Sequence, residues 1–192
     1  MTREYSPLSL QPLAPAARIS EATPPSRVTL DDPAISVMTD LQHVSVASTT
    51  PEEPIEEAHA VMIRRGVRLL FVLDPAGAVE GVITATDLLG EKPVRFMQER
   101  GIPHSEIRVG DIMTPAAHLD AVGLPQLASM RVGHVVATMH AVRRQHLMVS
   151  EEGGRRIRGL FSATQVARQL GVELQTTEVA RTFADIEAAL AR

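Results

Sequence analysis

The sequence contains an internal repeat. The segment GVITATD at residues 81–87 returns as GLFSATQ at residues 159–165, an offset of 78. Nearer the start of each copy, the segment VMT at residues 37–39 is matched by IMT at 112–114, an offset of 75. Because the matches keep the same order and their offsets differ by only three residues, they indicate two copies of one structural unit. A chain of 192 residues is long enough for two such units.

The strands of the first copy follow from its apolar runs. LLFVL at 69–73 predicts a strand buried on both faces, and DPAG at 74–77 predicts a turn. A return strand is expected over 79–84, and a short β-like segment at 44–46 precedes both.

A helix is predicted between the first two of these strands. Thr50-Pro51-Glu52-Glu53 has the pattern of a capping box, and Gly66 suits the end of the helix. One helical face carries the apolar residues Ile55, Ala58 and Met62. With a second helix after the return strand, the first copy has the order β-α-β-β-α.

The second copy repeats this order less regularly. It predicts a strand at 119–121, a helix over 132–144 and a hairpin from 145–149 and 157–162. Arg143-Arg144, which follows Met139, echoes Arg64-Arg65, which follows Met62. Cations at helix ends are favoured by the helix dipole, which explains all four arginines without a ligand.

The pattern divides the chain into five parts. Proline-rich residues precede the repeats, a short helix over 93–100 lies between them, and an apolar stripe at 179, 183, 186 and 190 predicts a terminal amphipathic helix. The expected parts are an N-terminal extension (1–33), repeat 1 (34–92), a linker (93–110), repeat 2 (111–170) and a C-terminal helix (171–192).

Composition argues against several kinds of function. The net charge of −4 and the 3% aromatic content do not favour binding to nucleic acid or to an anionic membrane. There are no cysteines, and no metal-binding, nucleophile or P-loop motif is found. We therefore expect a cytoplasmic protein without a catalytic cofactor, a metal or enzyme activity.

The ordered motifs resemble a tandem pair of cystathionine-β-synthase (CBS) domains over residues 35 to 170. The resemblance rests on VMTDLQHVSV, MIRRG, RLLFVLDPAGAVEGVIT, TATDLL and DIMTP. It implies an α/β fold in which two β-α-β-β-α repeats pack through their sheets around a pseudo-two-fold axis and leave two clefts. It also implies a regulatory, energy-sensing module that binds AMP, ADP, ATP or S-adenosylmethionine. Such pairs commonly form homodimers and would signal to a separate protein partner.

The resemblance also implies which residues bind the ligand. Thr84 and Asp87 match the family pattern G-h-h-[ST]-x-x-D, in which the carboxylate accepts hydrogen bonds from the ribose hydroxyls. Arg68 is expected near the phosphates, and apolar residues are expected around the adenine: Val44, Val46, Leu70 and Phe71. In the second copy Ser162 is present, Gln165 replaces the Asp, and His146 lies near the position of Arg68. One competent site and one degenerate site are therefore expected.

Two alternatives remain open at this stage. Thr-x-x-Asp and Ser-x-x-Gln are both capping-box variants, so helix capping alone explains Thr84 and Asp87 as well as Ser162 and Gln165. The second alternative is a dimerisation or interaction scaffold of CBS fold that binds no ligand, which Gln165 and the irregular segment at residues 123–125 favour.

Overall fold

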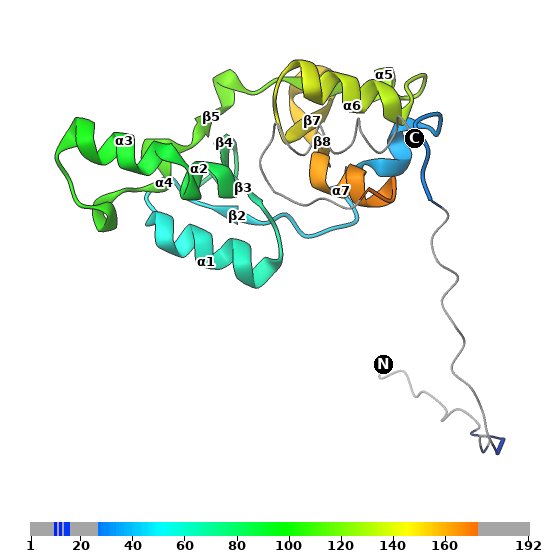
Figure 1. The fold of residues 1–192 in the computed structure, drawn as a ribbon, viewed down its shortest axis with the longest axis horizontal. Helices are drawn as coiled ribbons and strands as arrows, with labels where there is room; N and C mark the ends of the chain where they lie inside the picture. The colour runs from blue at the N-terminus through cyan, green and yellow to red at the C-terminus, as the bar shows by residue number, and fades with distance from the viewer. Residues whose placement is uncertain (1–9, 11, 13, 16–26, 173–192) are drawn as a thin grey trace, which may run out of the picture.

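The computed structural model in Figure 1 describes residues 10, 12, 14, 15 and 27–172. The predicted C-terminal stripe at 179–190 and most of the N-terminal extension lie outside the described residues. Within residues 27–172 the strands form two four-stranded sheets, one at each end of the long axis, with helices packed against each. No helix in this part of the chain is long and apolar enough to cross a membrane.

The first sheet contains the predicted hairpin of the first copy. Its strand order is β2 (Ser48–Thr49), β3 (Leu69–Leu73), β4 (Val79–Thr84) and β5 (Thr114–Pro115). The predictions for β3 and β4 are confirmed. The short strand expected at 44–46 is displaced along the chain, because the strand before α1 is β2 at 48–49. The helical segments of this half are α1 (Ile55–Arg65), α2 (Ala85–Leu89), α3 (Glu91–Arg100), η2 (His104–Glu106) and α4 (Val109–Ile112).

The second sheet has the equivalent arrangement. Its strand order is β1 (Thr39–Asp40), β8 (Arg156–Ser162), β7 (His146–Glu151) and β6 (Ala121–Gly123). The helical segments are η1 (Ala34–Val37), η3 (Ala116–His118), α5 (Leu124–Leu127), α6 (Val132–Ala141), η4 (Glu152–Gly154) and α7 (Ala163–Gln169). The β-α-β-β-α order is therefore present in both copies.

Each sheet takes one edge strand from the other copy. β1, at the start of the first copy, pairs antiparallel with β8, and β5, at the start of the second copy, pairs antiparallel with β4. Consequently residues 34–40 pack in the second half, where Ala34 and Val37 are fully buried. The order of the repeats along the chain thus differs from the division of the molecule in space.

The side chains of β3 alternate between its two faces, and this explains how the two halves meet. Leu69 and Phe71 share an apolar cluster with Met148 from the opposite sheet. Leu70 and Val72 point to the other face, into the core beneath α1. Successive side chains of a strand lie on opposite faces, so one short run packs both against helices and against the second sheet.

The predicted capping box at Thr50–Glu53 is wrong. α1 begins at Ile55 after Pro54, and no side chain caps it. The segment before it is instead held by distant backbone, because Val109 N–H donates to the Glu53 carbonyl and Gly110 N–H donates to the Pro51 carbonyl, both at 2.9 Å. The end at Gly66 is confirmed, with a left-handed φ of 63°.

Candidate functional site

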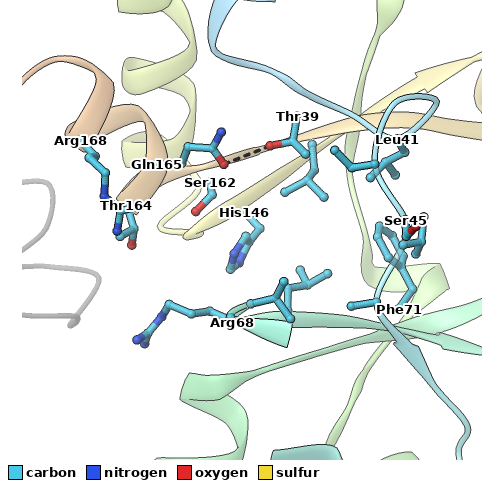
Figure 2. Close-up of a pocket in the computed structure, with 17 residues that line it drawn as sticks. Thr39, Leu41, Ser45, Arg68, Phe71, His146, Ser162, Thr164, Gln165 and Arg168 are labelled. Carbon is cyan, nitrogen blue, oxygen red and sulfur yellow. Dashed lines mark hydrogen bonds between the residues drawn. The ribbon is translucent and has the colours of Figure 1, made fainter. Parts of the chain in front are cut away.

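Two clefts at the starts of helices are each lined by residues of both halves. The Asp87 cleft, of about 270 Å³, lies between residues 84–87 at the start of α2 and residues 143–146 before β7. The Gln165 cleft, of about 230 Å³, lies between residues 162–168 around the start of α7 and residues 66–71 before and within β3. Figure 2 shows the Gln165 cleft. The two are equivalent under the repeat, which allows their side chains to be compared position by position.

Asp87 is both a helix cap and part of the cleft wall. Its Oδ2 accepts hydrogen bonds from Thr84 N–H at 2.8 Å and from Thr84 Oγ1 at 2.7 Å. Asp87 N–H donates in return to Thr84 Oγ1 at 3.2 Å. The capping interpretation is therefore confirmed for the first copy. It does not remove the carboxylate from the cleft, which Asp87 and Thr84 both line.

A second residue fixes the Asp87 carboxylate. Lys92 Nζ lies 2.7 Å from Asp87 Oδ1 and also donates to the Ile112 carbonyl at 3.0 Å. Lys92 is not among the residues that line the Asp87 cleft, so it holds the carboxylate from behind. The sequence motifs did not predict this role of Lys92, although it is the only lysine in a chain with 18 arginines and follows Asp87 by five residues.

Two arginines lie across the Asp87 cleft. α6 ends at Ala141, and Arg143 has a left-handed backbone with φ of 52°. Arg144 N–H donates to the Met139 carbonyl, just as Val67 N–H donates to the Met62 carbonyl. Arg143-Arg144 is thus equivalent to Gly66-Val67, and the alignment with Arg64-Arg65 is wrong.

The backbone of Arg143 carries a steric cost. For a residue with a Cβ atom the left-handed region costs on the order of 1 kcal/mol, whereas glycine enters it freely. The first copy has glycine at the same place, with φ of 63°. A strained residue at a cleft is a reason to look for a function of its side chain.

The Gln165 cleft uses its residues differently. Thr39 Oγ1 donates to Gln165 Oε1 at 3.1 Å, and Ser162 makes no side-chain capping bond. Capping is therefore wrong as an explanation of the second copy, because Gln165 reaches across to β1 instead of back to its own helix. In Figure 2 the polar side chains Arg68, Thr164 and Arg168 lie on one side, and Leu41 and Phe71 on the other.

The residues expected around one ligand are divided between the two clefts. Four of them line the Gln165 cleft together with Ser162: Val44, Val46, Arg68 and Phe71. Thr84 and Asp87 line the other cleft, opposite residues of the second half. Leu70 lines neither and is fully buried in the core of the first half. This division results from the packing of the two sheets, which brings each helix start against the other half.

His146 lies between the two clefts and lines both of them, as does Leu69. The pKa of His146 is lowered to about 4, mainly by burial and in part by the nearby charge of Arg68, while Asp87 acts weakly against both. The ring is therefore uncharged near neutral pH. A neutral imidazole can accept as well as donate a hydrogen bond toward either cleft.

Comparison with known protein families gives a match over part of the chain. Residues 34–93 match the model of the CBS domain family. No curated protein matches the chain.

Three solved structures are similar in fold. An uncharacterized conserved protein from Pyrococcus horikoshii is 24% identical with a TM-score of 0.56, over 78% of this chain and 100% of that one. CBSX2 from Arabidopsis thaliana, in complex with AMP, is 21% identical with a TM-score of 0.50, over 71% and 94%. The CBS domain pair of protein MJ0100, in complex with 5′-methylthioadenosine and S-adenosyl-L-methionine, is 18% identical with a TM-score of 0.51, over 75% and 97%. Residues 34–93 therefore match the CBS domain family, and the chain has the fold of a CBS-domain pair.

Proposed function

We propose that this protein is a regulatory module that binds an adenosine-containing ligand in the Asp87 cleft. The observation that carries the proposal is the Asp87 carboxylate, held by Thr84 and Lys92 at the wall of a cleft whose opposite side carries Arg143 and Arg144. Similar CBS-domain structures contain AMP, or 5′-methylthioadenosine and S-adenosylmethionine, all of which share the adenosine group.

The hydrogen bonds of Asp87 leave room for a ribose. A carboxylate has about four acceptor positions, and Thr84 N–H, Thr84 Oγ1 and Lys92 Nζ use three of them. One ribose hydroxyl takes the fourth position. The second displaces the Thr84 hydroxyl, which then turns toward the ligand. Both new hydrogen bonds are charge-assisted.

The remaining walls suit the rest of the ligand. Leu69, Val82 and Met148 give the cleft an apolar surface against which an adenine ring can pack. A bound ligand then contacts both halves of the molecule. If its affinity differs between two arrangements of the halves, binding shifts the population toward the favoured one. The change is passed on through a homodimer contact or a separate protein partner.

A ligand screen by thermal unfolding tests this proposal. AMP, ADP, ATP and S-adenosylmethionine are added to the protein at increasing concentration. A ligand at about 100 times its Kd stabilises by roughly 2.7 kcal/mol, which raises the unfolding midpoint by at least about 5 °C in a chain of this size. The Asp87→Asn variant, which keeps the size and one acceptor oxygen of the side chain, is expected to lose this rise.

The matched control is Asp111→Asn. Asp111 Oδ2 accepts from Arg108 N–H at 2.8 Å at the start of α4, so this variant also weakens a helix cap. Asp111 does not line the Asp87 cleft, and its variant should keep the full ligand response. If no adenosine ligand raises the midpoint of the original protein, the ligand-free scaffold is the better account.

A further inference from the structure

The repeat allows the same backbone position to be compared in the two clefts. At the end of α1 this position is Gly66, and at the end of α6 it is Arg143, with left-handed φ values of 63° and 52°. Each residue lines the cleft beside it. The helix end thus has the same shape in both copies, but only in the Asp87 cleft is a strained, cationic residue present where glycine fits better.

The other charges of the cleft leave the Arg143 side chain available. Within residues 27–172 its guanidinium makes no hydrogen bond or ion pair, whereas Arg144 Nη2 donates to the His118 carbonyl at 2.8 Å. Asp87 is already paired with Lys92 at 2.7 Å. The carboxylate of Asp120 also lines the cleft. Arg143 and Arg144 face two carboxylates across the cleft, but Asp87 is already paired from behind by Lys92, which leaves the Arg143 guanidinium available to an anionic ligand.

We infer that Arg143 is the anion-binding and specificity-determining residue of the Asp87 cleft, which selects adenosine ligands that carry a 5′-phosphate. This inference rests on the proposed function of the cleft. A guanidinium forms paired hydrogen bonds with phosphate oxygens, and a neutral 5′-substituent offers no such partner. The arrangement places Asp87 at the ribose and Arg143 at the phosphate, on opposite walls of one cleft. The backbone strain at Arg143 is retained because its side chain binds the ligand.

The test compares two ligands and two glycine variants. AMP and 5′-methylthioadenosine share the nucleoside, and only AMP has the phosphate. Their affinities are measured by titration calorimetry for the original protein, for Arg143→Gly and for Glu152→Gly. Glu152 is the control because it also has φ of 52° but lies in the β7–β8 turn and lines neither cleft.

Removing the side chain should separate stability from binding. Arg143→Gly should raise the unfolding midpoint of the ligand-free protein by about 2 °C. It should weaken AMP binding at least about ten-fold and leave 5′-methylthioadenosine within about two-fold. Glu152→Gly should raise the midpoint without changing either affinity.

Three results would overturn the inference in distinguishable ways. If AMP binds Arg143→Gly as tightly as the original protein, Arg143 is not the anion-binding residue, and the proposed function stands. If both ligands weaken equally, Arg143 shapes the cleft rather than binding phosphate. If neither ligand binds the original protein, the proposed function is wrong and this inference with it.

Discussion

Asp87 and Gln165 occupy equivalent positions but make different contacts. Asp87 forms a reciprocal cap with Thr84 and an ion pair with Lys92. Gln165 accepts a hydrogen bond from Thr39 on an edge strand that comes from the other copy. The sequence pattern predicted the first arrangement because it is local, within residues 84–87. It could not predict the second, because Thr39 is 126 residues away from Gln165.

The histidine between the clefts makes a prediction about pH. The pKa of His146 is lowered from its ordinary value of 6.5 to about 4, mainly by burial. The unfolded chain therefore binds a proton between these values that the folded protein does not. The contribution of the neutral His146 ring to stability is present above pH 6.5 and is lost as the pH falls toward 4. We expect the free energy of unfolding to decrease from pH 7 to pH 5, and to decrease less in His146→Gln.

Urea unfolding at several pH values measures this effect. The range from pH 7 to pH 5 is chosen because Asp40, whose pKa is held well below its usual range by hydrogen bonds from Arg158, loses its contribution only at lower pH. His43→Gln is the control, since His43 is an exposed residue beside Asp40. Equal pH dependence in His146→Gln and the original protein would show that the folded environment does not lower the pKa of His146.

At the scale of elements, the exchanged edge strands explain the glycine of the repeated motif. Gly81 in GVIT faces Thr114 and Pro115 of β5, and Gly159 in GLFS faces Thr39 of β1 and Met38 just before it. A Cβ atom at either glycine would meet the backbone of the crossing strand. Glycine therefore stands at both positions because it permits this close approach of two backbones.

Gly81→Ala is expected to destabilise the protein. The added methyl group would push against the Thr114 carbonyl oxygen and disturb the β4–β5 pairing. Overpacking of this kind costs typically about 1–3 kcal/mol, which urea unfolding resolves. Gly123→Ala is the matched control, since its nearest neighbour would be Pro125 Cδ at 3.9 Å, an ordinary contact. Equal stability of the two variants would contradict the tight crossing.

Element boundaries show where local sequence was sufficient. β3 and β4 follow from an apolar run and a turn, and Gly66 ends α1 as predicted. The predicted start of α1 was wrong because Val109 and Gly110, far along the chain, donate hydrogen bonds to the segment in which a local cap was expected. Where two distant segments compete for the same backbone groups, a local pattern cannot decide between them.

At the scale of the whole molecule, the packing of the two sheets forms the clefts. The apolar cluster of Leu69, Phe71, Val82 and Met148 joins the sheets and sets each helix start against the opposite half. The sequence predicted the fold and the residues at the start of α2. It did not predict that Arg143, His146 and Met148 form the opposite wall. That wall depends on how the halves meet, which the repeat pattern alone does not specify.

The packing also makes the two clefts unequal. Asp87 presents a charged acceptor to its cleft, whereas the Gln165 cleft has no carboxylate among its lining residues. Neutral amides are weaker acceptors for a ribose diol than a carboxylate. We therefore expect one adenosine ligand per chain, bound in the Asp87 cleft.

Titration calorimetry with AMP tests this expectation most directly. We expect one AMP per chain for the original protein and for Gln165→Ala, and no binding by Asp87→Asn. Two AMP molecules per chain, or unchanged binding by Asp87→Asn, would contradict it.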